Sequence, residues 1–94
     1  MIESLFSMQD KICVITGGSR GLGSYMAQGF LEAGAKRVYI TARKAEACIS
    51  AAEELSQYGE CIAIPGDVAT SEGLQNLVSE LMSREQYIDV LVNN

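Results

Sequence analysis

The feature that most constrains this chain is a run of glycines between an apolar segment and an amphipathic one. Residues 14–25 read VITGGSRGLGSY and contain Gly17, Gly18, Gly21 and Gly23. Fixing a glycine costs more backbone entropy than fixing any other residue. These glycines therefore indicate a place where the backbone turns tightly or comes very close to another group.

Short apolar runs alternate with amphipathic segments along the whole chain. Four apolar runs predict strands, at residues 11–16, 37–42, 61–65 and 88–94. Three amphipathic segments predict helices, at residues 22–33, at residues 44–58, and from a cap at Thr70 or Ser71 onward. Because strands and helices alternate with short connections, the order βαβαβαβ predicts an α/β fold, a Rossmann-type doubly wound parallel sheet with right-handed crossovers.

Each predicted helix has an apolar stripe that should form its buried face. The stripes are, in chain order, Leu22, Met26, Phe30 and Ala33; Cys48, Ala52 and Leu55; and Leu74, Leu77, Val78, Leu81 and Met82. The first and fourth strands lack a polar face, as expected of strands that helices cover on both sides. We expect the third helix to pack on the face of the sheet opposite the first two.

The composition excludes several classes of function. A net charge of -5 offers no basic surface to nucleic acid. No apolar run approaches the length of a membrane span, and acidic residues stand where a signal peptide would be basic, so we expect a cytoplasmic protein without a membrane partner. Because the chain has no histidine and no C-x-x-C spacing, we expect no metal site. Cys13, Cys48 and Cys61 are predicted to be buried as small apolar groups.

A glycine-rich turn between a strand and a helix is typical of a nucleotide phosphate site. The first turn of a helix offers unpaired N–H groups and the positive end of the helix dipole. We predict that Gly17 makes the tight turn, that Gly21 permits a pyrophosphate to approach, and that Gly23 lets the helix pack against the strands. The Ser19 hydroxyl could bind the phosphate or close the turn. A P-loop is disfavoured, because GGSRGLGSY lacks the Gly-Lys-Ser/Thr ending of that motif.

The end of the second predicted strand distinguishes NADP from NAD. An NAD site usually has an acidic residue about 20 positions after the glycines, which binds the ribose hydroxyls. This chain has ITARK there, with Arg43 and Lys44 and no acid before Glu46. Arg43 could hold a 2′-phosphate with its planar guanidinium group, and Arg20 could approach the phosphate from the glycine turn. We therefore expect NADP(H); the alternative is a solvated helix start, although cations there oppose the helix dipole.

Three short motifs together resemble those of the short-chain dehydrogenase/reductase family. TGGSRGLG resembles its T-G-x-x-x-G-x-G cofactor motif, GDV at residues 66–68 its adenine-contact motif, and the final NN the first half of its N-N-A-G motif. They occur in the family's order on the matching predicted elements. One departure is Asp10, where many members have glycine. The cofactor site that this resemblance implies consists of Thr16, Gly17, Ser19, Arg20, Gly21, Leu22, Gly23, Arg43, Asp67, Val68 and Asn93.

The resemblance also implies individual roles. Asp67 would bind the adenine amino group and the Val68 backbone would complete that edge, while Asn93 would line the adenine ribose and tie the fourth strand to its neighbours. Without the resemblance, an aspartate after a strand is more often a turn or cap residue, and a pair of asparagines indicates only a turn.

Within the family, TARK and GGSRGLG look most like NADP-dependent 3-ketoacyl reductases and their relatives that act on sugars or polyols. The family's chemistry uses a serine, and a tyrosine followed four residues later by a lysine. None of Tyr25, Tyr39, Tyr58 and Tyr87 has a lysine at that spacing. We therefore predict no catalytic residue here, and expect residues 1–94 to be the N-terminal cofactor-binding part of a larger single Rossmann domain that continues after the fourth strand.

The expected parent protein reduces a carbonyl such as a 3-oxoacyl thioester, or oxidises the matching alcohol, by hydride transfer with NADP(H). A sugar or polyol dehydrogenase, a non-catalytic NADP-binding or regulatory module, and an oligomerising fragment whose glycines serve only the turn are the alternatives. We expect a small-molecule substrate and a homo-oligomer, a tetramer or a dimer, formed through elements that follow in the chain.

Overall fold

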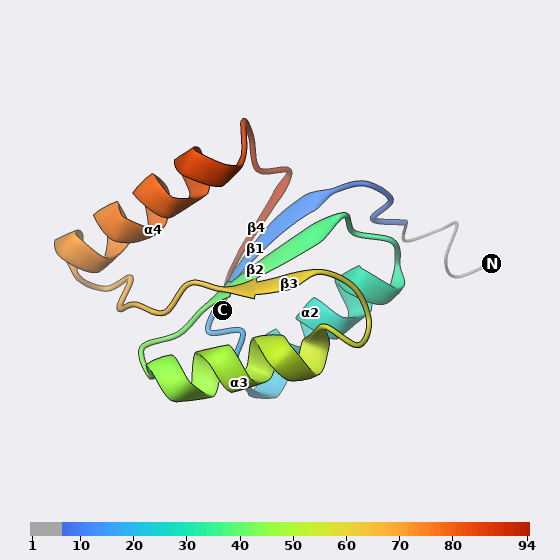
Figure 1. Cartoon of the computed structure of the whole chain (residues 1–94), viewed down its shortest axis with the longest axis horizontal. Helices are drawn as coiled ribbons and strands as arrows, with labels where there is room; N and C mark the ends of the chain where they lie inside the picture. The colour runs from blue at the N-terminus through green and yellow to red at the C-terminus, as the bar shows by residue number, and fades with distance from the viewer. Residues whose placement is uncertain (1–6) are drawn as a thin grey trace.

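The computed structural model describes residues 7–94 and contains a four-stranded parallel sheet between helices (Figure 1). The strands are β1 (Ile12–Thr16), β2 (Arg37–Thr41), β3 (Cys61–Ala63) and β4 (Val90–Asn93), and the helices are α2 (Gly21–Glu32), α3 (Ala45–Leu55) and α4 (Ser71–Arg84). The strands lie in the order β3-β2-β1-β4. The predicted Rossmann-type α/β fold is confirmed.

β1 lies inside the sheet, and all five of its residues are buried. It pairs in parallel with β2 on one side and with β4 on the other. The register places Thr16 opposite both Thr41 and Asn93. The carboxyl ends of three strands therefore lie level, at the edge where the strand order reverses.

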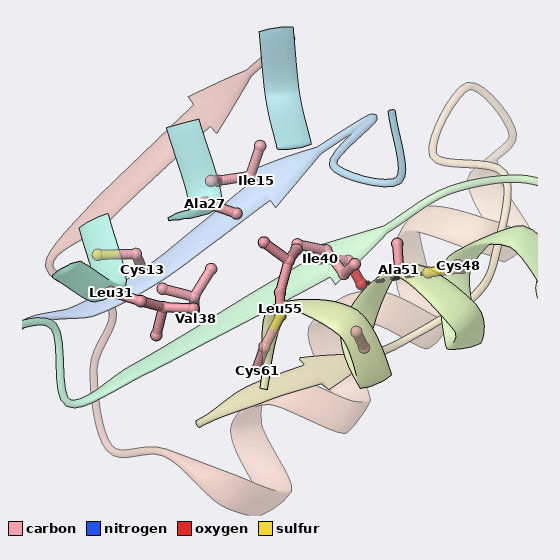
Figure 2. Close-up of a cluster of buried hydrophobic side chains, with 11 residues drawn as sticks. Cys13, Ile15, Ala27, Leu31, Val38, Ile40, Cys48, Ala51, Leu55 and Cys61 are labelled. Atoms are coloured by element: carbon pink, nitrogen blue, oxygen red, sulfur yellow. Dashed lines mark hydrogen bonds between the residues drawn. The ribbon is translucent and has the colours of Figure 1, made fainter. Parts of the chain in front are cut away.

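Helices α2 and α3 cover one face of the sheet, as Figure 1 shows. Alternate strand residues point into the cluster beneath them, where they meet both helices (Figure 2). The buried members are Cys13, Ile15, Val38, Ile40 and Cys61 from the strands, Ala27 and Leu31 from α2, and Cys48, Ala51, Ala52 and Leu55 from α3. The predicted stripe of α3 is confirmed.

The three cysteines are free and buried, as predicted. Burial raises the pKa of the Cys13 thiol to about 11 and that of the Cys61 thiol to about 12. Burial also raises the pKa of Cys48. These thiols are therefore protonated at neutral pH and serve as small apolar groups.

The predicted stripe of α2 is wrong by one residue. The buried positions are Gly23, Ala27 and Leu31. Leu22 is 66% exposed, whereas Met26 and Phe30 are only partly buried at the border of the cluster. α2 approaches the sheet through its smallest side chains, and its larger apolar groups lie beside that contact.

Helix α4 lies on the opposite face, as predicted, but it covers that face incompletely. Leu77 is its one buried residue and packs against a cluster that contains Val14 and Tyr39. The rest of its predicted stripe is exposed or only half-buried, namely Leu74, Val78, Leu81 and Met82.

Among the described residues, helices do not cover both faces of the fourth strand, although its apolar run is typical of a strand so covered. β4 alternates between half-buried and exposed positions, and Leu91 is 68% exposed. β4 is the last strand of the described sheet, so only β1 pairs with it. Leu91 lines a cavity of about 570 Å³ between α4 and the sheet.

Several predicted elements are shorter in the structure. The helix predicted at residues 44–58 ends at Leu55, and the strand predicted at residues 88–94 extends only over Val90–Asn93. β3 ends at Ala63 rather than at Pro65. The backbone nevertheless follows β2 further, because Ile64 and Gly66 donate their N–H groups to β2 and the residue after it.

Among residues 7–94, no helix is both long enough and apolar enough to cross a membrane.

Thr70 caps α4, since its side chain accepts the N–H of Gly73 at 3.0 Å. That outcome confirms one of the two predicted cap positions.

Glu85, the residue after α4, ties that helix to β2. Its carboxylate accepts the Tyr39 hydroxyl at 2.5 Å and also accepts a guanidinium N–H of Arg37. Arg37 also pairs with Glu60 at 3.0 Å. Burial opposes the ionisation of Glu85, but the hydrogen bonds from Tyr39 and Arg37 outweigh it and lower its pKa. Burial and the neighbouring Glu85 raise the pKa of Tyr39 to about 12.

We predict that Glu85→Gln lowers the free energy of unfolding at pH 7 by about 1–3 kcal/mol, because it leaves the buried Tyr39 hydroxyl and the half-buried Arg37 guanidinium facing a neutral group. A carboxylate with a lowered folded pKa stabilises the fold above its unfolded pKa, near 4.5, and loses that effect as pH falls through the folded value. The difference between wild type and variant should therefore shrink in acid. Urea denaturation at pH 7 and below pH 4 measures both quantities.

The matched control is Glu80→Gln on the same helix, since Glu80 makes an exposed pair with Arg84 at 3.4 Å. That substitution should lower the free energy of unfolding by less than about 0.5 kcal/mol at either pH. Equal losses in the two variants would show that Glu85 does not hold α4 in place.

Asp10 has a φ of 62°, in the left-handed region that glycine adopts most easily. This backbone conformation suits the glycine that many family members have here, and aspartate is one of the few other residues that tolerate it. We predict that Asp10→Gly stabilises the protein by about 0.5–1 kcal/mol and that Asp10→Ala destabilises it, because alanine tolerates this region less well than aspartate. Urea midpoints of the three proteins test this, and a less stable glycine variant would contradict it.

Candidate functional site

A cavity of about 310 Å³ lies where the carboxyl ends of β1, β2 and β4 meet the loop after β3. In open α/β sheets, ligands bind outside the carboxyl ends of the strands, where the strand order reverses. We call this space the switch-point cavity. Its wall consists of Thr16, Gly17, Ser19, Arg20, Thr41, Ala42, Arg43, Lys44, Ala47, Gly66, Asp67, Val68, Ala69, Asn93 and Asn94.

The structure brings most of the predicted site residues to this wall. Those that line it are Thr16, Gly17, Ser19, Arg20, Arg43, Asp67, Val68 and Asn93. Gly21, Leu22 and Gly23 do not line it; they form the start of α2, directly after Arg20. What each of these residues would do toward a ligand stays a prediction.

The glycine turn begins with a left-handed residue, since Gly17 has a φ of 69°. Its N–H donates to the carbonyl of Thr41 at 2.8 Å, which attaches the turn to the end of β2. Gly21 has a φ of 61°, and apart from its chain neighbours and the backbone of its own helix no described atom lies within 4 Å of the place where its Cβ would stand. This open space is what close approach of a ligand requires.

Gly23 makes its closest contacts with the glycine turn. A Cβ at this position would lie 2.4 Å from the Gly17 carbonyl oxygen and 2.8 Å from Nδ2 of Asn94. Gly23 therefore lets α2 start directly against the glycine turn, rather than against the strands. The contact with a strand belongs to Gly18, where a Cβ would lie 2.6 Å from Cγ2 of Ile40.

The start of α2 is left without a protein cap among the described residues. Its cap position is Arg20, whose side chain makes no capping hydrogen bond, and its first turn contains no acid. α4 differs, since Thr70 caps it and Glu72 lies in its first turn. The first N–H groups of α2 and the positive end of its dipole therefore remain available to an anion.

Cations outnumber acids around the switch-point cavity. Arg20, Arg43 and Lys44 are exposed on its wall, and within residues 7–94 none of them forms an ion pair. Asp67 is the one carboxylate on the wall. This arrangement suits a phosphorylated ligand.

Asp67 also holds the loop in which it lies. Its Oδ1 accepts the N–H of Ala69 at 3.0 Å, and its carbonyl accepts the Thr70 hydroxyl at 2.9 Å. A Cβ at Gly73 would lie 1.9 Å from that carbonyl oxygen, so the loop depends on a glycine there. Sequence reasoning missed Gly73, and its only signal is a glycine in the first turn of a helix.

Asn93 and Asn94 tie the end of β4 to β1. The Thr16 hydroxyl lies 3.1 Å from Oδ1 of Asn93 and accepts the Asn94 N–H at 3.0 Å. Nδ2 of Asn94 donates to the Gly17 carbonyl at 3.2 Å. The last two residues thus support the glycine turn, a role of Asn94 that the sequence analysis missed.

A family model described as short chain dehydrogenase matches residues 11–94. The chain is 51% identical, over 89 residues, to the rhamnolipids biosynthesis 3-oxoacyl-(acyl-carrier-protein) reductase of Pseudomonas aeruginosa, covering 95% of this chain and 34% of that protein. It is 42% identical, over 84 residues, to L-fucose dehydrogenase of Mus musculus, covering 89% of this chain and 29% of that protein.

Solved structures show the same likeness. The RhlG/NADP active-site complex of Pseudomonas aeruginosa superimposes with a TM-score of 0.90 at 49% identity, covering 95% of this chain and 36% of that one. L-sorbose reductase of Gluconobacter frateurii, complexed with NADPH and L-sorbose, gives a TM-score of 0.87 at 34% identity, covering 94% of this chain and 34% of that one.

The chain spans about a third of the length of these relatives. The family match extends from just before β1 to the end of β4 and includes the whole glycine turn. This chain belongs to the short-chain dehydrogenase family.

Proposed function

We propose that residues 1–94 are the N-terminal, dinucleotide-binding part of a larger Rossmann domain in an NADP(H)-dependent oxidoreductase. The observation that carries this proposal is the uncapped start of α2 beside a cavity rimmed by Arg20, Arg43 and Lys44. The bound dinucleotide would supply the hydride that such an enzyme transfers. Within these residues we assign no catalytic group.

The pyrophosphate would lie against the start of α2. Its charge would meet the free N–H groups and the positive end of the helix dipole, with the Ser19 hydroxyl available on the cavity wall. The empty space beside Gly21 leaves room for a phosphate to reach the backbone. Leu22 and Gly23 complete this first turn.

The 2′-phosphate would lie at the end of β2. Ala42 stands there with no carboxylate to repel the phosphate, and Arg43 follows it on the wall of the cavity. Arg20 reaches the same cavity from the glycine turn. A planar guanidinium can donate two parallel hydrogen bonds to a phosphate, which favours NADP(H) over NAD(H).

The adenosine would occupy the remaining part of the cavity. One carboxylate oxygen of Asp67 accepts the Ala69 N–H, which leaves the other for the adenine amino group. The Val68 backbone would meet the same edge, and Asn93 would lie against the ribose from the end of β4.

The substrate we propose is a carbonyl compound such as a 3-oxoacyl thioester, or the matching alcohol. This choice rests on the 51% identity to a 3-oxoacyl-(acyl-carrier-protein) reductase. A sugar or polyol is the second candidate, because L-fucose dehydrogenase and L-sorbose reductase are also similar to this chain. Oxidation of NADPH by the protein with 3-oxoacyl thioesters or with L-sorbose distinguishes them.

We also propose that the protein is a cytoplasmic homo-oligomer.

Calorimetric titration with NADPH and with NADH tests the proposed cofactor. We expect NADPH to bind at least about tenfold more tightly, since a phosphate contact of about 1.4 kcal/mol corresponds to that ratio. A protein that binds neither nucleotide would overturn the proposed function. Equal affinity for the two nucleotides would overturn the preference for NADP(H).

Arg43→Ala identifies the residue responsible for this preference. We predict that it weakens NADPH binding by about tenfold and leaves NADH binding nearly unchanged, because only NADPH carries the 2′-phosphate. Arg84→Ala is the control, since Arg84 lies at the far end of α4 and outside the switch-point cavity. If Arg43→Ala weakened the binding of both nucleotides equally, Arg43 would not bind the 2′-phosphate.

A further inference from the structure

Thr41, the last residue of β2, has a buried hydroxyl group without a partner. The residue is 2% exposed, and its Oγ1 is the one buried side-chain polar atom in residues 7–94 that lacks a hydrogen bond. Nearly all buried polar groups in folded proteins are paired, and an unpaired one destabilises the fold. Such a group beside a candidate binding cavity points to a partner outside the fold.

Within residues 7–94 no side chain or backbone group hydrogen-bonds to this hydroxyl, and the polar groups of its neighbours already have partners. Thr16 lies directly opposite Thr41, but its hydroxyl is engaged by Asn93 and Asn94. The carbonyl of Thr41 itself accepts the N–H of Gly17 at 2.8 Å, and the carbonyl of the next residue accepts the N–H of Gly66 at 2.9 Å. A ligand in the switch-point cavity, which Thr41 lines, can supply the missing partner.

The place of Thr41 on the wall indicates which part of a ligand it meets. It precedes Ala42 and Arg43, and the loop that carries Asp67 runs beside the end of β2. These residues surround the space proposed above for the adenosine and its 2′-phosphate.

We propose that Thr41 is a further cofactor-binding residue, whose hydroxyl binds the 2′-phosphorylated ribose of the dinucleotide. This inference rests on the proposed function. A threonine hydroxyl can donate to a phosphate oxygen and can both donate to and accept from a ribose hydroxyl. Because Oγ1 is closed to solvent in this structure, the contact forms when the side chain rotates about χ1 and turns the hydroxyl toward the cavity.

Thr41→Val should therefore change stability and affinity in opposite directions. Valine keeps the shape of threonine but removes the hydroxyl, so the protein without cofactor should become more stable, with a melting temperature higher by about 2–5 °C. Binding of NADPH should become weaker by about 3–10-fold, because the hydroxyl no longer meets the ribose. A hydroxyl with only a structural role would leave the affinity unchanged.

The measurements are thermal unfolding of the purified protein without cofactor and calorimetric titration with NADPH and with 2′,5′-ADP. The affinity for 2′,5′-ADP should fall by the same factor as that for NADPH, because both ligands contain the 2′-phosphorylated ribose. Thr41→Ser, which keeps the hydroxyl, should bind both ligands nearly as tightly as wild type.

Two results would overturn the assignment while leaving the proposed function intact. One is a Thr41→Val protein that binds NADPH as tightly as wild type, and the other is a loss for NADPH without a loss for 2′,5′-ADP. Failure of the wild-type protein to bind NADPH would instead overturn the proposed function itself. The two failures are therefore distinguishable.

Discussion

The contact between Gly23 and the Gly17 carbonyl sets how closely α2 approaches the end of β1, and the candidate site depends on that approach. A Cβ at Gly23 would lie 2.4 Å from the carbonyl oxygen, so a larger residue would push the helix away from the turn. The same turn is fixed to both neighbouring strands, because Gly17 donates to Thr41 of β2 and accepts from Asn94 beyond β4. The free N–H groups of α2 are thereby held at the edge where the strand order reverses, which is where a dinucleotide phosphate is expected.

The order of elements and most of the site could be predicted from the sequence, because the signals are local. A continuous apolar run such as residues 11–16 indicates a strand buried on both faces, and β1 is buried throughout. The glycines follow that run directly, so the turn they form must lie at its carboxyl end. Arg43 and Asp67 follow the next two strands, and parallel strands bring their carboxyl ends to one edge of the sheet. The sequence therefore predicts that these residues meet in one cavity.

The errors arise where three-dimensional neighbours decide the outcome. Hydropathy selects Leu22 as the buried residue at the start of α2, but close approach to the turn favours the smaller Gly23, and the whole stripe shifts by one residue. β4 reads as a strand covered on both faces, yet Leu91 is exposed because α4 does not reach over it. The role of Gly73 depends on its distance from the Asp67 carbonyl, a contact that no spacing rule reveals. Composition and periodicity carry no information about such contacts.

The two threonines at the ends of β1 and β2 show why a binding site differs from the rest of a fold. Thr16 and Thr41 are paired in register and are both buried, but only Thr16 finds partners, since β4 lies on its side of the sheet. β2 has β3 as its other neighbour, and the chain leaves that strand before it can supply a polar side chain to Thr41. Selection for stability alone would favour an apolar residue at such a position. A polar residue that destabilises the cofactor-free protein is instead expected at a binding site. There a bound ligand supplies the missing hydrogen bond and so stabilises the complex.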